Sequence, residues 1–134
     1  MSILDVVAKR ASCDRGRSAA LLVRDRRIIA TGYVGSPQGT RSCDEIGHLL
    51  KTSYNASGAA SQHCIRTTHA EMNALAQAAR MGIPVKGATL YVTMTPCLVC
   101  TNVLINAGVK RLVCKAHYHA ETDSLSVFKE AEVE

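Results

Sequence analysis

Short apolar runs alternate along the chain with stretches of helical periodicity. Four segments place apolar residues at a helical spacing: 2–12, 68–81, 97–107 and 123–133. Four others are short apolar runs typical of strands: 18–24, 27–33, 88–94 and 110–116. Asp25 and Arg26 form a short polar break between the first two strands, which predicts an antiparallel hairpin. Gly82 and Gly108 end the second and third helices.

The predicted order is α-β-β-α-β-α-β-α. Strand–helix–strand passages imply parallel pairing with right-handed crossovers, so we expect a mixed sheet between layers of helices. No internal repeat, low-complexity tract or linker divides the chain, which predicts one domain spanning residues 1–134. Residues 34–66 are rich in Gly, Ser, Thr and Cys and have weak periodicity. An irregular stretch of this length indicates a functional or metal-binding role.

The amino-acid composition and charge make several classes of protein unlikely for this chain. Apolar residues make up 47% of the chain, with one Phe and no Trp, so the core must be aliphatic. The net charge of +5 is compatible with anionic small molecules, but the basic residues are scattered, which makes nucleic-acid binding unlikely. No apolar run approaches the ~20 residues that span a bilayer. No signal peptide is recognisable, so we expect a cytoplasmic protein.

The six cysteines favour metal binding over disulfides. The chain has no export signal and is long enough to fold without cross-links. Cys97 and Cys100 stand three residues apart after Pro96, at the start of a predicted helix. That spacing places both sulfurs on one face of the helix, whose N-terminus favours the thiolate form.

His69, Glu71, Cys97 and Cys100 form a catalytic pattern, because His-x-Glu precedes Pro-Cys-x-x-Cys and each motif opens a predicted helix. Two thiolates and one imidazole hold zinc and leave a fourth position for water, as in catalytic sites. Zinc lowers the pKa of that water to near 7. Glu71 is placed to move protons without binding the metal. The complete pattern is the signature of zinc deaminases.

Five stretches resemble the cytidine deaminase superfamily, and within it the deoxycytidylate (dCMP) deaminases of bacteria and phages: TGYVGSPQG, CDEIGH, CIRTTHAEMNA, THAEMNAL and TPCLVC. The resemblance covers roughly residues 2–133. It implies a three-layer α/β/α sandwich with a mixed sheet of four to five strands. It also implies hydrolytic deamination of dCMP to dUMP and ammonia, which supplies dUMP for thymidylate synthesis.

The resemblance assigns His69, Cys97 and Cys100 to the catalytic zinc and Glu71 to proton transfer. It also implies that the base contacts the main chain of Ala70 and Thr95 and the aromatic ring of Tyr118. The 5′-phosphate needs a cation, because Arg in particular binds phosphate in a bidentate manner. The residues considered for this contact are Arg24, Arg26, Arg27, Arg66 and Lys115, of which Arg26 and Lys115 are carried forward.

The resemblance further implies a homo-oligomer, often a hexamer. Members are activated by dCTP and inhibited by dTTP, with Mg²⁺. The residues expected to bind the effector are Gly32, Tyr33, Val34, Gly35 and Arg80. Val34 stands where the family usually has Asn, and Val offers no side-chain hydrogen bonds. We therefore expect weakened binding or regulation.

A second, structural zinc is also implied, because several family members bind one in the corresponding irregular region. The candidates are Cys13, Cys43, His48, His63 and Cys64, and the preferred set is Cys13, Cys43, His48 and Cys64. Four such ligands make a closed tetrahedral site.

Two alternatives stay open. A relative acting on another base, such as tRNA adenosine, free cytosine or guanine, or a riboflavin-pathway intermediate, would share the catalytic motif. A structural zinc-binding module would need four ligands around the Pro-Cys-x-x-Cys metal and no role for Glu71. In that case Glu71→Gln would leave function intact.

Overall fold

The computed structural model describes residues 2–54, 56–117 and 122–134. Its main sheet has four strands in the order β2-β1-β5-β6. These strands are β1 (Ala19–Arg24), β2 (Arg27–Tyr33), β5 (Thr89–Met94) and β6 (Arg111–Ala116). β1 pairs antiparallel with β2 and β5, whereas β5 and β6 are parallel. The prediction of a mixed sheet is confirmed, including the hairpin and the parallel pair joined by a helix.

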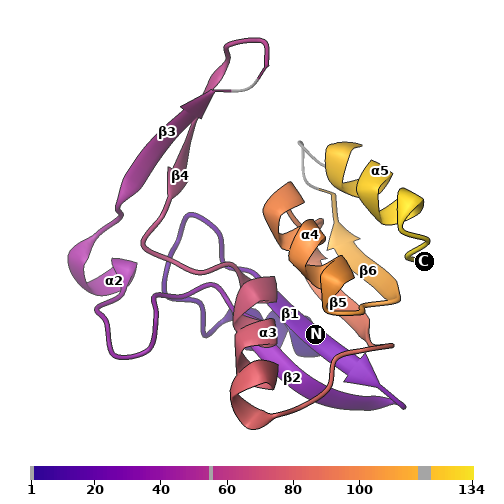
Figure 1. The fold of residues 1–134 in the computed structure, drawn as a ribbon. Coiled ribbons are helices and arrows are strands. Elements are labelled where there is room, and N and C mark those ends of the chain that lie inside the picture. The colour runs from indigo at the N-terminus through magenta and orange to yellow at the C-terminus, as the bar shows by residue number, and fades with distance from the viewer. Residues whose placement is uncertain (1, 55, 118–121) are drawn as a thin grey trace.

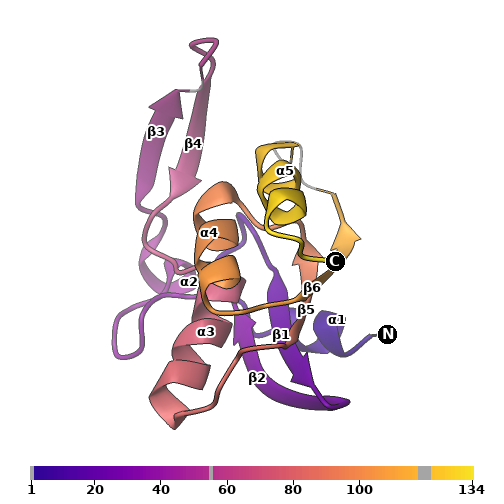
Figure 2. The ribbon, with the colours of Figure 1, turned by 45° about the vertical axis from the view of Figure 1, so that its right-hand side comes forward.

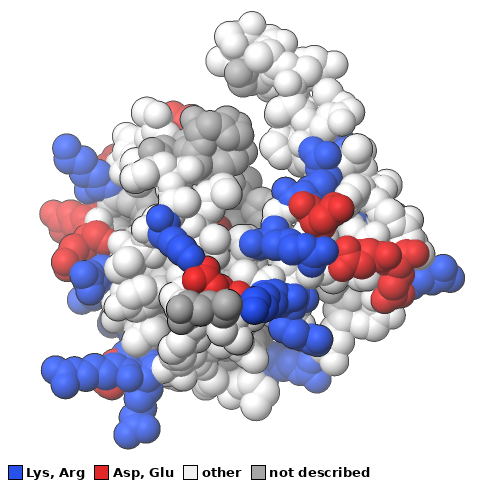
Figure 3. Space-filling model, turned by 180° about the vertical axis from the view of Figure 1, so that it is seen from behind, with Lys and Arg blue, Asp and Glu red and all other residues white. Residues whose placement is uncertain are grey.

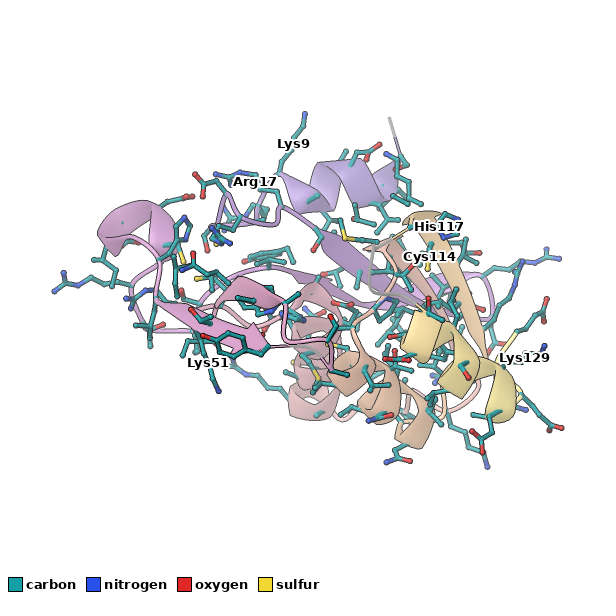
Figure 4. All side chains as sticks on the ribbon, turned by 90° about the horizontal axis from the view of Figure 1, so that it is seen from above. Lys9, Arg17, Lys51, Cys114, His117 and Lys129 are labelled. Carbon is teal, nitrogen blue, oxygen red and sulfur yellow. The ribbon has the colours of Figure 1, made fainter. Side chains whose placement is uncertain are left out.

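Helices cover both faces of this sheet. The helices that pack on it are α1 (Ile3–Ala8), α3 (Ala70–Met81), α4 (Leu98–Asn106) and α5 (Thr122–Glu130). α1 lies on one face, and α3, α4 and α5 lie on the other, as Figures 2 and 4 show. The three-layer α/β/α arrangement is therefore confirmed. Across the described ranges, no helix combines the length and apolar character needed to cross a membrane.

The stretch 34–66 contains structure that the sequence pattern did not predict. It holds the short helix α2 (Cys43–Ile46) and an antiparallel hairpin of β3 (Leu50–Tyr54) and β4 (Ala60–Cys64). The hairpin projects from the body of the molecule (Figure 1), and its outer part carries no charged side chains (Figure 3). Most residues of both strands are exposed, so neither strand has the apolar alternation that marks a half-buried strand.

Close contact between β2 and α3 fixes the place of the helix that carries part of the site. The helix face toward the sheet is made of small buried residues, Ala70, Ala74 and Ala78. A Cβ atom on Gly32 of β2 would lie 2.1 Å from the carbonyl oxygen of Ala70 and 2.4 Å from the amide nitrogen of Ala74. Only glycine allows this approach, so Gly32 has a packing role in the fold.

Candidate active site

Two helix starts bring His69, Cys97 and Cys100 together. His69 is the N-cap of α3, Cys97 is the N-cap of α4, and Cys100 lies in the first turn of α4. The His69 Nδ1 atom lies 3.6 Å from Cys97 Sγ and 3.4 Å from Cys100 Sγ. The three possible ligand atoms all lie within 4.8 Å of one another. Two motifs 28 residues apart thus form one compact N/S cluster.

The donor set and spacing of this cluster fit zinc. With Zn–S near 2.3 Å and Zn–N near 2.1 Å, tetrahedral geometry requires an S···N separation of about 3.6 Å. The observed separations are 3.4 and 3.6 Å. Among the described residues, the cluster offers three ligands, which leaves one tetrahedral position for a solvent molecule or a substrate.

Hydrogen bonding within the metal-free cluster shifts the pKa values of its three members in different directions. Hydrogen bonds from Cys100 and His69 lower the pKa of the Cys97 thiol to about 4, although burial acts in the opposite direction. The same bond to Cys97 raises the pKa of Cys100. The hydrogen bond to Cys97 also raises the pKa of His69. Of the two thiols, Cys97 is thus the one whose environment favours the thiolate, the form that ligates zinc.

Glu71 is a buried carboxyl group beside the cluster. It lies in the first turn of α3 and is only 6% exposed. Burial raises its pKa, whereas the positive charge of His69 lowers it. Its negative charge in turn contributes to the raised pKa of Cys100, and Glu71 lines the same cavity as His69 and Cys97. A buried carboxyl with a raised pKa suits proton transfer near neutral pH.

A cavity of about 350 Å³ adjoins the cluster. Its lining includes His69, Glu71 and Cys97 on one side and the buried residues Val34 and Thr95. The volume is within the usual range for small-molecule sites. The cavity therefore gives a small ligand direct access to the three-ligand cluster and the acid.

A second cluster joins Cys13, Cys43, His48 and Cys64, whose possible ligand atoms also lie within 4.8 Å of one another. Cys13 Sγ lies 3.4 Å from His48 Nδ1, and Cys43 Sγ lies 3.5 Å from Cys64 Sγ. Tetrahedral zinc requires about 3.6 Å for S···N and about 3.8 Å for S···S. This is the preferred set from the sequence.

The second cluster has an acidic neighbour, Asp14, and does not include His63. The other ring nitrogen of His48, Nε2, lies 2.9 Å from Asp14 Oδ1, as is usual for a metal-binding histidine. His63, the fifth sequence candidate, is not part of the cluster. Its ring lies 3.0 Å from the hydroxyl of Ser61, and it lines the cavity instead.

The other residues predicted to contact the substrate are Ala70, Thr95, Tyr118, Arg26 and Lys115. Ala70 is fully buried, and the amide of Thr95 donates to the carbonyl of Ala116 at 3.2 Å, so this amide is engaged by the sheet. Tyr118 lies outside the described residues. The two phosphate candidates Arg26 and Lys115 do not line the cavity.

Arg26 and Lys115 are not among the residues that line the cavity. Arg26 lies in the β1–β2 turn, and the antiparallel register of β1 and β5 puts that turn at the end of the sheet opposite Thr95. Lys115 is near the end of β6, where its ammonium group pairs with Asp5 of α1. Their sequence positions alone did not reveal which end or face of the sheet each would occupy.

The effector candidates hold one loop against α3. The Asn73 side-chain amide donates to the carbonyl of Tyr33 at 2.7 Å, and Arg10 lies over the Tyr33 ring. Gly35 and Thr68 exchange two backbone hydrogen bonds beside His69. Further along α3, the Arg80 guanidinium donates to the side chain of Gln38 in the same loop. A separate lining residue, Arg15, was missed because it belongs to no recognisable motif.

Comparison with known proteins identifies the family. Residues 1–116 match the family described as the cytidine and deoxycytidylate deaminase zinc-binding region. The chain belongs to this family. The family carries the zinc-binding deaminase chemistry that its description names, and this membership confirms the recognition made from the sequence.

Individual relatives agree with this membership. The chain is 38% identical over 128 residues to ComE operon protein 2 of Bacillus subtilis, covering 96% of this chain and 63% of that protein, so it spans less than two thirds of that relative. It is 37% identical over 118 residues to deoxycytidylate deaminase of Mycobacterium phage D29, covering 84% and 88%. The crystal structure of dCMP deaminase from cyanophage S-TIM5 with dCMP and dUMP superimposes with a TM-score of 0.77 at 26% identity, covering 98% and 88%.

Proposed function

We propose that this protein is a zinc-dependent hydrolase that converts dCMP to dUMP and ammonia. The observation that carries the proposal is the cluster of His69, Cys97 and Cys100, at separations that fit zinc, beside the buried carboxyl of Glu71 on a cavity wall. A structural zinc module is disfavoured, because the described cluster offers three ligands, not four, and adjoins a cavity.

In this proposal His69, Cys97 and Cys100 hold the zinc, which when bound supplies a nucleophile near neutral pH by lowering the pKa of a water molecule. Glu71 takes a proton from the attacking water and delivers it to N3 of the pyrimidine. The oxygen bonds to C4. Glu71 then takes the remaining proton of the C4 hydroxyl and passes it to the 4-amino group, so that the bond from C4 to the amino nitrogen breaks, ammonia leaves and C4 becomes a carbonyl. The surrounding walls, including Val34, exclude bulk water from the base.

The proposal is tested by replacing Glu71 with Gln, which keeps the shape and removes the proton carrier. We expect kcat for dCMP to fall by about 10²–10⁴-fold, with zinc content and thermal stability retained. Glu130→Gln, an exposed position on α5, is the matched control and should behave as wild type. Full turnover by the Glu71→Gln protein would refute the mechanism.

The substrate is proposed from the activities for which the relatives are named and from the cavity. The phage relative is a deoxycytidylate deaminase, and the cyanophage structure holds dCMP and dUMP. In the view of Figure 3, basic side chains are interspersed with acidic ones, which favours a small nucleotide over a nucleic acid. Ammonia release should be greatest with dCMP when it is compared with deoxycytidine, dCTP, cytosine and an anticodon stem-loop adenosine. Turnover of the adenosine alone would favour the alternative.

We also propose allosteric regulation by nucleotides, from the resemblance of the chain to the deoxycytidylate deaminases. Nucleotide effectors, dCTP as activator and dTTP as inhibitor with Mg²⁺, would act on a homo-oligomer of hexameric size. Val34 is buried in the cavity wall and offers no polar group, so we expect a weak response. Val34→Asn should strengthen the effect of dCTP on the KM for dCMP. Light scattering with and without effectors measures the oligomer.

A further inference from the structure

One polar side chain near the catalytic cluster has no part in the proposed chemistry. Asn73 lies on α3, four residues after His69 and therefore on the same side of the helix. It is partly buried, and it is not among the described residues that line the cavity or form the two cysteine–histidine clusters. Any role of Asn73 in the site is therefore exerted through the groups that it contacts.

The side-chain amide of Asn73 donates two hydrogen bonds. Its Nδ2 atom lies 2.7 Å from the carbonyl oxygen of Tyr33 and 3.2 Å from the carbonyl oxygen of Thr68. An amide nitrogen carries two hydrogens, so both of its donors are engaged. Tyr33 ends β2, and Thr68 lies in the segment that leads into α3. Asn73 therefore ties the helix to two stretches of backbone that are far apart in sequence.

Both carbonyl groups adjoin residues of the site. Thr68 directly precedes His69, whose ring faces the two cysteines of the catalytic cluster. Tyr33 directly precedes Val34, which lies in the cavity wall. A shift of either carbonyl would therefore be passed through one peptide unit to a residue that faces the metal or the ligand.

The start of α3 needs this support because His69 does not cap the helix with its side chain. An N-cap side chain usually accepts a hydrogen bond from the first turn and so fixes the chain where it enters the helix. His69 occupies the N-cap position without such a bond. The chain before it is held by Thr68 instead, whose carbonyl accepts from Asn73 and from the Gly35 amide at 3.4 Å. The Thr68 amide in turn donates to the Gly35 carbonyl at 2.9 Å.

We propose that Asn73 is a positioning residue that holds His69 in place for the catalytic zinc. Its amide fixes the Thr68 carbonyl, and with it the backbone of the metal ligand, against the end of β2. Metal–ligand distances tolerate about 0.2 Å, so small movements of His69 weaken the site. The inference rests on the proposed function only for the identity of the bound metal.

Replacing Asn73 with Leu tests this, because Leu removes both donors, keeps the branching at Cγ and favours a helix. We expect a chelator to remove zinc from the catalytic cluster at an about 10- to 100-fold lower concentration than in the wild type, while the second cluster keeps its zinc. Alkylation by iodoacetamide, followed by peptide mass spectrometry, locates the loss. Cys97 and Cys100 should become reactive, and the cysteines of the second cluster should stay protected. Asn102→Leu, at an exposed position of α4, is the matched control and should retain zinc as the wild type does.

A merely structural role for Asn73 would lower the melting temperature and release zinc from both clusters together. That result overturns the inference, and so does a folded Asn73→Leu protein whose catalytic cluster retains zinc as tightly as the wild type. Asn73→Asp keeps the size of the side chain but cannot donate when it is ionised. It has the same expected result and serves as the second variant if Asn73→Leu does not fold.

Turnover of dCMP by the wild-type protein tests the proposed function separately. Selective loss of zinc from the catalytic cluster of Asn73→Leu, combined with a zinc-loaded wild type that leaves dCMP unchanged, would support the role of Asn73 and refute the proposed reaction.

Discussion

Replacing Gly32 with Ala should have two effects: it should destabilise the protein and weaken zinc binding by His69, Cys97 and Cys100. A Cβ atom at this position would lie 2.1 Å from the Ala70 carbonyl oxygen, whereas real Cβ atoms essentially never approach within 3.0 Å. The helix α3 must therefore move by about 0.9 Å relative to β2. Both contacts are backbone atoms, so no side-chain rotation relieves them. Overpacking of this kind lowers the free energy of unfolding by about 1–3 kcal/mol. We expect a value near 3 kcal/mol for Gly32→Ala, because the contact is between backbone atoms that cannot rotate away.

The same displacement affects zinc because His69 is the N-cap of α3 while Cys97 and Cys100 belong to α4. Metal–ligand distances tolerate about 0.2 Å, so the site is lost when even a quarter of the 0.9 Å movement of α3 is passed on to His69 relative to α4. For a chain of this size, 3 kcal/mol lowers the melting temperature by roughly 10 °C.

Differential scanning calorimetry and elemental analysis of zinc measure both effects of Gly32→Ala. Gly16→Ala is the matched stability control, because a Cβ atom there meets nothing within 4 Å. We expect it to melt within about 1–2 °C of the wild type. A Gly32→Ala protein that melts with the wild type and keeps its full zinc content would refute the packing argument.

Three further predictions follow from other parts of the structure. Cys43→Ser should lower the zinc content from two equivalents per chain to one, whereas Cys114→Ser, outside both clusters, should keep two. Burial raises the pKa of Glu71 above 4.5, the ordinary value of a glutamate side chain. Because Glu71 must be ionised to accept a proton, the acid limb of kcat should have its midpoint above pH 4.5, and a lower midpoint contradicts this. Hydrogen bonds from Lys115 and the start of α1 lower the pKa of Asp5 from 3.8 to about 2. The stabilisation is therefore complete above pH 3.8 and is lost as the pH falls through 2, so the melting difference between Asp5→Asn and wild type should vanish in strong acid.

The cluster of His69, Cys97 and Cys100 could be predicted from the sequence because much of its geometry is local. Cys97 and Cys100 share one helix turn, and His69 and Glu71 share another, so each pair is positioned by the helix that it opens. The four strands of the main sheet and the four helices that pack on it could also be predicted, because the apolar pattern of each reflects its burial.

The tertiary structure alone decided which distant residues share the cavity. The strands β3 and β4 could not be predicted from the sequence, because they are mostly exposed and carry no apolar alternation. Arg26 and Arg15 look alike as isolated arginines, yet the antiparallel register carries Arg26 to the far end of the sheet, while the loop anchored at Cys13 brings Arg15 to the cavity. Such placement depends on strand order and loop closure, long-range contacts that local spacing does not encode.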